Sequence, residues 1–323
     1  MFDEMKIQVN KDDKGYRLDV FLAKKIKSLS RSKIKTSIKK GYVLIDGKSS
    51  QPKFLLNGNE IIKIFFKKED SFLHGENLKL DIIFVDQDII VINKSSGMVM
   101  YPGAGHSSGT LINALVYHFP EILIQNVDRP AIVHRLDKET SGVMVCAKNN
   151  FSYNALVNSF KKREVVKFYR AFCVGIFNDI NFELKTGHKR HNINRKKFTT
   201  KLTFPGKNDN SIRFAHSKFK LLNNCHYVSE LLVSLLTGRT HQIRAQLSDI
   251  GHPILGDYIY GVLKYIKNFK NINMRTAALS INRHALHAQS IGFFHPRTKK
   301  YVEFKAKLPD DLKKLQLNLF KAK

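Results

Sequence analysis

The chain has 323 residues, of which 43% are hydrophobic and 11% aromatic, so it can bury an extensive core and is longer than one small domain requires. Its 55 Lys and Arg residues against 27 Asp and Glu residues leave a formal net charge of +28, which favours a polyanionic partner. Nucleic acid is the commonest such partner, and a general enrichment in lysine is the alternative explanation for the charge.

The sequence gives no sign of membrane insertion or secretion. Its best apolar stretch, 82–93, is interrupted by Asp86 and Asp88, and the first residues lack a basic segment followed by an apolar one. The three cysteines are far apart and never paired as Cys-x-x-Cys: Cys146, Cys173 and Cys225. This spacing excludes a disulfide framework and a cysteine zinc site, and it predicts a reducing, cytoplasmic environment.

Regular patterning begins with a small module over 16–64. Its predicted elements are a helix over 18–26, a second helix capped by Ser30 and ended by Gly41, a strand over 42–45 and a tight turn at 46–47. We take 1–70 as this first domain and the polar segment 71–79 as a linker.

The second predicted helix carries basic side chains and no acid: Arg31, Lys33, Lys35, Lys39 and Lys40. A solvated helix face normally mixes both signs, because like charges one turn apart repel. We therefore predict that these side chains bind RNA phosphates. The runs Arg17-Leu18-Asp19, Ser30-Arg31-Ser32-Lys33 and Gly41-Tyr42-Val43 resemble the S4 RNA-binding domain, a small α/β module.

A larger domain is predicted over 80–323. Its elements are strands over 82–85 and 89–92, a glycine-rich loop over 97–109, a helix from 111, strands at 132–133 and 143–147, a helix through 155–160, strands over 168–174 and 228–236, and a helix through 243–250 closed by Gly251. Because strands and helices do not alternate regularly, the pattern predicts an α+β fold and not a parallel βαβ array.

Two patterns in this domain could bind ligands of other classes. The loop Gly103 to Gly109 lies between a strand-like run and a helix, but its third glycine comes one residue too late for a dinucleotide fingerprint and no P-loop lysine follows. His188 and His191 have a metal-like spacing, but the basic Lys189-Arg190 between them disfavours a cation. We interpret both as ordinary loop or RNA-facing segments.

The segment 134–142 concentrates ionisable groups in a loop between two apolar strands. Asp137 stands beside Arg135 and Lys138, so it should stay ionised well below neutral pH and serve as a nucleophile or base. A structural salt bridge is the alternative role for Asp137.

A second charged cluster occupies 237–244. Arg244 lies one position round from Ile243, at the edge of the predicted buried face, where it could be half buried and paired with a carboxylate. A surface arginine on a basic protein is the alternative.

Both clusters belong to a series of motifs that runs from Asp81 to Pro309. The series comprises Asn93-Lys94 with Gly97, Pro102-Gly103-Ala104-Gly105 with Gly109-Thr110, His134-Arg135-Leu136-Asp137 with Thr140-Ser141-Gly142, Phe168-Tyr169-Arg170-Ala171 before Gly175, Gly238 to Arg244, Gly251 to Asp257, Arg283, Ala285 to Ala288, and His295-Pro296. In this order the motifs resemble the RluA family of RNA pseudouridine synthases. The resemblance implies a mixed, mainly antiparallel central sheet flanked by helices.

The resemblance also implies an isomerase that flips a uridine out of RNA, breaks its glycosidic bond and rejoins the base through carbon. Asp137 would be the catalytic carboxylate, attacking the anomeric carbon or assisting proton removal from the adjacent one. Arg244 would keep Asp137 ionised, and Tyr169 would stack on the flipped base. Further RNA contacts are expected from Arg135, which would fill the space the base leaves, and from His134 and Arg239. No cofactor and no metal are expected.

Within the family, the Pro102 to Gly105 loop, the lead-in at 128–131 and the overall length are most similar to members that modify helix 69 of 23S rRNA. The implied partner is 23S rRNA or a pre-50S ribosomal particle, and we expect a monomer without membrane contact. The same chemistry on another rRNA or tRNA site, and a non-catalytic RNA-binding assembly factor, are the alternatives. Four positions depart from the usual motifs and bear on substrate fit: Ser95, Tyr101, His106 and Gln246.

Overall fold

The computed structural model describes residues 2–26, 31–67, 73–103, 105–124, 129–202 and 211–320. Several sequence-based assignments lie outside them: the cap Ser30, residues 71–72 of the linker, Ala104, Asp128 and the side chain of Lys33. The chain divides into two units, Met1–Phe72 and Leu73–Lys323, and each is described by itself. None of the described helices is both long and apolar enough to cross a membrane.

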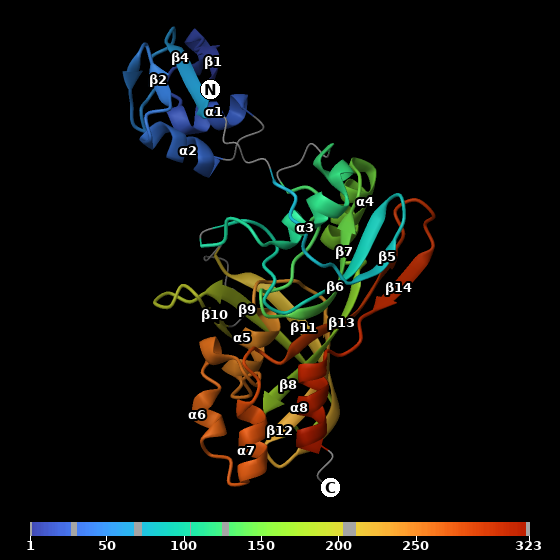
Figure 1. The fold of residues 1–323 in the computed structure, drawn as a ribbon. Helices are drawn as coiled ribbons and strands as arrows, with labels where there is room; N and C mark the ends of the chain where they lie inside the picture. The colour runs from blue at the N-terminus through green and yellow to red at the C-terminus, as the bar shows by residue number, and fades with distance from the viewer. Residues whose placement is uncertain are drawn as a thin grey trace. The chain divides into compact units, whose positions relative to one another are not determined.

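The first unit is a four-stranded antiparallel sheet, ordered β1-β4-β2-β3, packed against two helices (Figure 1). Its elements are β1 (Phe2–Gln8), a 3-10 turn (Lys11–Asp13), α1 (Leu18–Lys25), α2 (Arg31–Lys39), β2 (Val43–Ile45), β3 (Lys48–Ser49) and β4 (Ile61–Lys67). The predicted helices, strand and turn are present, with Asp46 and Gly47 both at positive φ as a two-residue hairpin turn requires. β1, β3 and β4 are not among the elements that the sequence pattern predicts.

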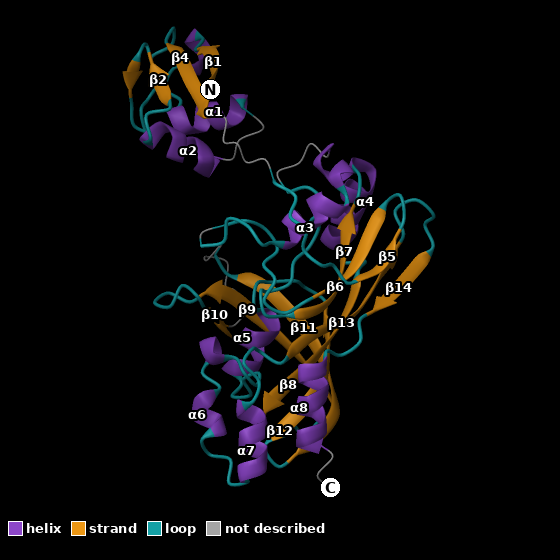
Figure 2. Cartoon of the chain, viewed as in Figure 1, coloured by secondary structure: helices purple, strands orange, loops and turns teal. Residues whose placement is uncertain are grey.

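The second unit is built on a ten-stranded sheet in the order β10-β9-β11-β12-β8-β13-β7-β6-β5, with β14 paired to β13 (Figure 2). Its strands are β5 (Ile82–Val85), β6 (Ile89–Lys94), β7 (Ser141–Ala147), β8 (Val166–Val174), β9 (Asn181–Arg190), β10 (Phe198–Leu202), β11 (Arg213–Cys225), β12 (Val228–Leu235), β13 (Leu286–Phe294) and β14 (Tyr301–Lys305). Among the described strands only β7 and β13 pair in parallel. The predicted α+β class with a mainly antiparallel sheet is confirmed.

Helices cover both faces of this sheet. They are α3 (Leu111–His118), α4 (Asn150–Lys162), α5 (Gln242–Asp249), α6 (Leu263–Ile266), α7 (Ile272–Leu279) and α8 (Asp310–Phe320), with 3-10 turns at Pro120–Ile124 and Tyr258–Tyr260. Every residue of β7 is buried, since Met144 packs in the same core as α3 while Val143 and Val145 pack with Leu156 of α4. This explains why β7 reads as a continuous apolar run and not as an alternating one.

One sequence-based assignment needs revision. Ile132-Val133 is not a strand, because only an isolated bridge joins Ile132 to Cys146 and the backbone then turns away into the charged loop.

Residues of the predicted linker hydrogen bond to the second unit: Asn113 Nδ2 donates to the carbonyl of His74 and Glu76 accepts from the amide of Gly109. The boundaries 1–70, 71–79 and 80–323 stay a prediction.

A tight backbone approach at Gly142 fixes where the charged loop joins β7. Gly142 has a φ of +121°, and a Cβ built on it would lie 2.2 Å from the carbonyl oxygen of Ala288 on β13. We expect Gly142→Ala to lower the free energy of unfolding by more than about 2 kcal/mol, measured by urea denaturation. Gly97→Ala is the control, because Gly97 has a φ of +86° with open space around it and should cost only about 1 kcal/mol. If the two variants lose the same free energy of unfolding, the backbone at Ala288 must move aside at little cost, and the close approach does not constrain the fold.

Candidate active site

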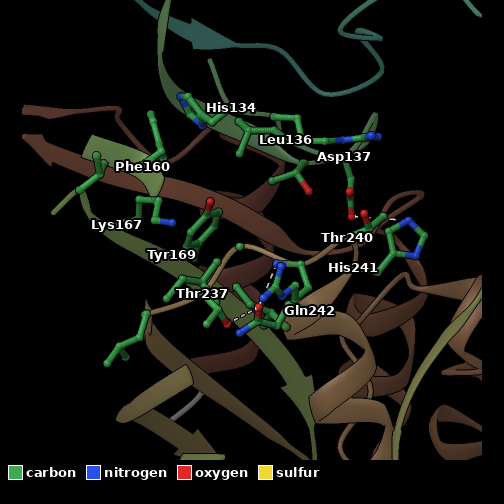
Figure 3. Close-up of a pocket in the computed structure, with 18 of the residues that line it drawn as sticks. His134, Leu136, Asp137, Phe160, Lys167, Tyr169, Thr237, Thr240, His241 and Gln242 are labelled. Carbon is green, nitrogen blue, oxygen red and sulfur yellow. Dashed lines mark hydrogen bonds and ion pairs between the residues drawn. The ribbon is translucent and has the colours of Figure 1, made fainter. Parts of the chain in front are cut away.

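A pocket of about 490 Å³ opens where three segments of the second unit converge. Its walls are the charged loop 133–140, the end of α4 with the start of β8, and the loop 235–241 that leads into α5 (Figure 3). Asp137, Tyr169, Arg239 and Arg244, which are far apart in the sequence, all line it. The pocket is therefore the place where the predicted site residues of this unit meet.

Arg244 lies between two carboxylates. Its Nη1 donates to Asp137 Oδ2 at 2.9 Å, while its Nε and Nη2 donate to Asp257 at 2.6 and 3.0 Å. The side chain of Arg244 is buried on α5, more deeply than the half-buried position expected from the sequence, whereas Asp137 remains 16% exposed to the pocket. Asp257 thus fixes the guanidinium in the plane that presents Nη1 to Asp137.

The surroundings of Asp137 keep it ionised. Burial alone would raise its pKa, but the charges of His241 and Arg244 and the Arg244 hydrogen bond hold the pKa below the usual aspartate value. Burial lowers the pKa of His241, whose Nε2 lies 3.7 Å from Asp137 Oδ2, so the arginine is the dependable counter-charge at neutral pH. A carboxylate that is ionised, oriented and open to a pocket can act as a nucleophile or a base.

A buried lysine, Lys94, holds the backbone next to Asp137 in place. Lys94, at the end of β6, is 1% exposed and its Nζ donates to the carbonyls of Ser95, Met98 and Lys138 at 2.7, 3.0 and 3.0 Å. The amide of Gly97 binds the same Lys138 carbonyl at 2.9 Å. These contacts tie the charged loop to the turn after β6 and so restrict the position of Asp137.

The Tyr169 ring forms one wall of the pocket. Tyr169 lies on β8, is 8% exposed and points its hydroxyl into the pocket in Figure 3. Burial, helped by the negative charge of Asp137, raises the pKa of this hydroxyl, so it stays protonated. A flat ring beside an ionised carboxylate offers a stacking surface for a planar ligand.

The other predicted contacts of this unit differ in their surroundings. Arg135 is exposed at the pocket and has no ion-pair partner among the described residues. Arg239 lines the pocket and donates from Nε to the carbonyl of Phe214 at 3.1 Å. His134 Nε2 instead accepts from the amide of Val145 and its ring stacks on Phe160, while burial lowers its pKa to about 3. A neutral, already hydrogen-bonded ring has little capacity to bind a phosphate.

In the first unit, the basic helix has an acid partner that the helix sequence itself does not contain. The fully buried Asp19 of α1 binds Arg17, Arg31 and Lys35 at 3.0, 3.0 and 3.5 Å. The cations outnumber this carboxylate, and Lys39 and Lys40 are exposed. The net positive charge of this face agrees with the predicted phosphate contacts, but Arg31 and Lys35 also hold α2 onto α1.

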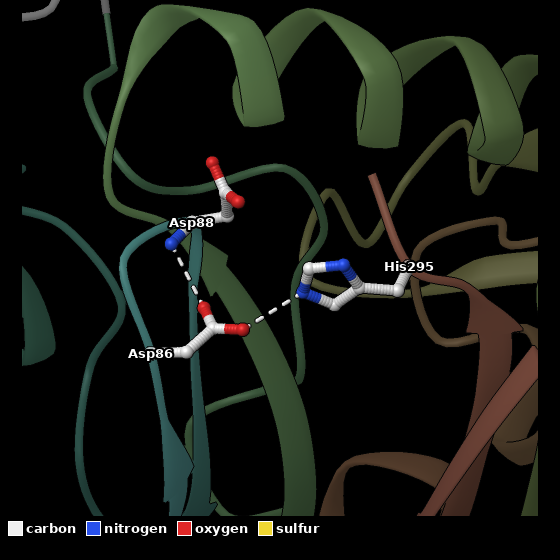
Figure 4. Close-up of side chains that lie close together, drawn as sticks. All are labelled: Asp86, Asp88 and His295. Atoms are coloured by element: carbon white, nitrogen blue, oxygen red, sulfur yellow. Dashed lines mark hydrogen bonds and ion pairs between the residues drawn. The ribbon is translucent and has the colours of Figure 1, made fainter. Parts of the chain in front are cut away.

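One cluster among the described residues has the spacing of metal ligands: Asp86, Asp88 and His295 (Figure 4). Arg297 binds both oxygens of Asp88 at 2.6 and 2.9 Å, and Asp86 accepts from two backbone amides and from His295. The polar atoms of these groups therefore have hydrogen-bond partners without a cation. Their contacts join the turn after β5 to the segment after β13. The two histidines with a metal-like spacing are also hydrogen bonded within the protein. His188 Nε2 bonds to the carbonyl of Thr240, and His191 Nδ1 accepts from two nearby backbone amides.

Sequence reasoning missed several residues that shape the pocket. Asp257 was visible only as part of a motif, because nothing in the sequence shows that it is adjacent to Arg244. Lys167 lies two positions before Tyr169 on the same strand, and the two-residue period of a strand could have placed both in the pocket. Of the four departures from the usual motifs, Gln246 is fully buried and bound to Ser217, Leu184 and Thr186.

Both units match known protein families. Residues 88–249 match the family described as RNA pseudouridylate synthase, and residues 17–62 match the S4 domain. The chain is 37% identical to a ribosomal large subunit pseudouridine synthase D from Buchnera aphidicola, over 95% of both chains, and 36% identical to one from Haemophilus influenzae, over 98% of this chain and 94% of that one. A human RNA pseudouridylate synthase domain-containing protein 4 shares the fold, with a TM-score of 0.58 and 23% identity over 74% of this chain and 92% of that one.

The role of Arg244 as a counter-charge can be tested through stability. Arg244→Met would leave Asp137 and Asp257 buried without a cation, and we expect the free energy of unfolding at pH 7 to fall by about 3–5 kcal/mol. The lowered pKa of Asp137 stabilises the native state above the aspartate pKa of the unfolded chain, and this contribution is lost as the pH falls through the lower native value. In the variant, burial without a cation should raise the pKa values of the two carboxylates, so the difference between variant and wild type should begin to shrink above about pH 4 and continue to shrink as the pH falls through the lowered pKa of Asp137 in the wild type.

Urea denaturation of both proteins between pH 3 and pH 8 measures this difference. Arg239→Met is the control, because Arg239 makes one backbone hydrogen bond. We expect this variant to lose no more than about 1.5 kcal/mol of the free energy of unfolding. Equal losses for the two variants would contradict the assigned pairing of Arg244.

Proposed function

Since the chain belongs to the family of RNA pseudouridine synthases and carries an S4 domain, we propose that it isomerises uridine to pseudouridine in helix 69 of 23S rRNA, with Asp137 as the catalytic carboxylate. The family consists of isomerases, and relatives named ribosomal large subunit pseudouridine synthase D support the large-subunit rRNA as the substrate. The observation that carries the proposal is the 2.9 Å hydrogen bond from Arg244 to an ionised, pocket-facing Asp137.

The charge around the pocket suits an RNA substrate. The cationic residues that line it are Arg135, Lys161, Arg163, Lys167, Arg239 and Arg244, whereas Asp137 is the one acidic residue among the lining residues that the structure describes. Such a surface attracts the phosphate backbone and leaves a single carboxylate for the ribose. The substrate is 23S rRNA, free or within a pre-50S particle in the cytoplasm, and the reaction needs neither a cofactor nor a metal.

The first step is extrusion of the target uridine. A base inside a stem-loop is stacked, and flipping it out costs a few kcal/mol. The Tyr169 ring offers the flipped uracil a replacement stacking surface, and the exposed guanidinium of Arg135 can stack in the space the base has left. These contacts offset the lost stacking on both sides of the target nucleotide.

The chemical step then takes place at the ribose. An ionised Asp137 can bond to C1′ as the glycosidic bond breaks, or it can take a proton from C2′. Both routes need the carboxylate to be charged and aimed, and both release the uracil as an anion. Arg244 supplies that charge state and orientation, and Asp257 holds Arg244 in place. The released base then turns and its C5 bonds to C1′, while the bond from Asp137 to C1′ breaks in the first route or Asp137 returns the proton to C2′ in the second.

Removing the charge of Asp137 tests its role directly. We expect Asp137→Asn to reduce the single-turnover rate on a helix 69 stem-loop by at least about a thousand-fold, because the substitution keeps the shape and removes the reacting group. RNA affinity should change little, since phosphate contacts supply most of it. The same variant should leave the helix 69 uridines unmodified when it replaces the wild-type gene, as read by pseudouridine mapping of total RNA.

The outcomes separate the alternatives for this protein. A variant that keeps a substantial part of the wild-type rate would contradict Asp137 as the catalytic carboxylate. Loss of pseudouridine at another rRNA or tRNA position would retain the chemistry and overturn the helix 69 target. Unchanged pseudouridine in a strain without the gene would favour a non-catalytic assembly role.

The basic helix α2 is proposed to bind RNA phosphates and to contribute affinity without chemistry. Lys39 and Lys40 are exposed at its end, so the double variant Lys39→Gln/Lys40→Gln should bind the stem-loop more weakly. Each lost phosphate contact reduces the slope of log affinity against log salt concentration by about 0.9, so the slope should become shallower by about two units. The single-turnover rate at saturating protein should be unchanged.

The matched control for this measurement is Lys218→Gln/Lys220→Gln, which removes the same charge from exposed positions of β11. Titrations at several salt concentrations compare the two double variants. If both give the same small change, α2 does not contact RNA and its charge reflects composition alone.

A further inference from the structure

Lys167 differs from the other cations held inside the second unit. Lys94 donates to three backbone carbonyls, Arg244 binds two aspartates, and Arg283 binds Asp311. Lys167 is also partly buried, yet among the described residues its ammonium has no carboxylate or carbonyl partner. The ammonium lies over the Phe160 ring, 5.7 Å from Nζ to the ring centroid. Burying an ammonium without a counter-charge costs free energy, and a ligand that offers the ammonium a hydrogen-bond acceptor would offset this cost.

The position of Lys167 shows where that ligand would lie. Lys167 and Tyr169 are alternate residues of β8, so both side chains leave the same face of the strand and both line the pocket. Figure 3 shows Lys167 beside Tyr169, on the side away from Asp137. A Cβ built on Gly238 would lie 3.7 Å from Lys167 Nζ, so the ammonium lies close to the loop before α5, at the wall of the pocket.

We propose that Lys167 is a further catalytic residue, whose ammonium binds the carbonyl oxygen on the far edge of the flipped uracil and stabilises the anion formed when the glycosidic bond breaks. This inference rests on the proposed function, because it takes the ribose to lie at Asp137 and the uracil to stack on Tyr169. In that arrangement the base extends from Asp137 across the Tyr169 ring towards Lys167.

The chemistry of uracil explains why an anchor at this position is useful. When the bond between C1′ and N1 breaks, the electron pair stays on the base and is delocalised onto O2 and O4. O4 lies across the ring from N1, and O2 lies across the ring from C5. Turning the base so that C5 replaces N1 at the ribose therefore exchanges O4 for O2 at the far edge.

A single ammonium can thus hold the anion before and after it turns. Lys167 donates a hydrogen bond throughout and keeps its proton, while the electron pair returns to form the bond between C5 and C1′. The proton on C5 then leaves to a base and N1 takes up a proton, which restores the conjugated ring of a neutral uracil. A fixed cation in a site of low polarity stabilises such an anion far more than water-exposed charge would.

A prediction about pH follows from the same site. Burial lowers the pKa of Lys167 to about 8, so its charge is lost in a range that activity measurements reach. The other charged and titratable groups that line the pocket are Lys161 and Arg163 at the end of α4, His134, Arg135 and Asp137 in the charged loop, Arg239 and His241 before α5, Arg244 on α5, and Tyr169 on the same strand as Lys167. The pKa of His134 lies near 3 and that of Tyr169 is raised, so neither titrates near pH 8.

The experiment compares Lys167→Met and Lys167→Arg with wild type on a helix 69 stem-loop, using single-turnover rates at saturating protein and separate binding titrations. We expect Lys167→Met to lower the rate by at least about a hundred-fold while affinity and its salt slope stay within error. We expect wild type to lose rate above about pH 8, and Lys167→Arg to remain active there because arginine keeps its charge. Lys94, whose pKa is also lowered to about 8, would produce an alkaline loss that Lys167→Arg does not move.

Controls separate this inference from the proposed function. Lys162→Met removes the same charge from an exposed position outside the pocket and should leave the rate unchanged. If Asp137→Asn abolishes the reaction but Lys167→Met does not slow it, the role of Lys167 is wrong and the proposed function stands. A weaker affinity with a shallower salt slope and a normal rate at saturation would assign Lys167 to a phosphodiester and overturn the uracil contact. If Lys167→Met fails to fold, the pH profile of Lys167→Arg decides.

Discussion

The arrangement of the pocket depends on one buried guanidinium. Arg244 joins Asp137, from a loop before β7, to Asp257, from a segment after α5, although these residues are far apart in the sequence. A buried cation between two carboxylates is stable only when the geometry of all three is kept, so the loop, the helix and the following segment must fold together. The same contact that completes the tertiary structure sets the charge of the group that faces the substrate.

The sheet provides the rigid frame for this contact. β7 is buried on both faces, and the close approach of Gly142 to β13 fixes where the charged loop begins. Lys94 then holds the same loop through its backbone carbonyls, at a cost in desolvation that three hydrogen bonds offset. Arg135, by contrast, is exposed at the pocket, where its guanidinium is accessible to a nucleotide drawn out of an RNA stem.

Charge has two different functions in this chain. Asp19 of α1 forms ion pairs with Arg31 and Lys35 of α2, and these pairs hold the two helices together. Lys39 and Lys40, at the end of α2, remain exposed. In the pocket, Arg244 has acidic partners and Lys167 has none among the described residues. Composition alone predicts a polyanionic partner, but only the pairing pattern distinguishes cations that stabilise the fold from those that remain available to a ligand.

The sequence by itself determined the α+β class, most helices around the pocket and the presence of Asp137, Tyr169 and Arg244, because periodicity and motif order are local properties. It missed β9, β10, β11, β13 and β14, and it made Ile132-Val133 a strand. β9 and β14 alternate exposed and half-buried residues, so neither forms the apolar run that marks a buried strand. The tertiary structure alone decided that Asp257 orients Arg244, that His134 is neutral and already hydrogen bonded, and that Lys167 has no carboxylate or carbonyl partner in the part of the chain that the structure describes. Burial and pairing depend on segments remote in the chain, so no local pattern could supply them.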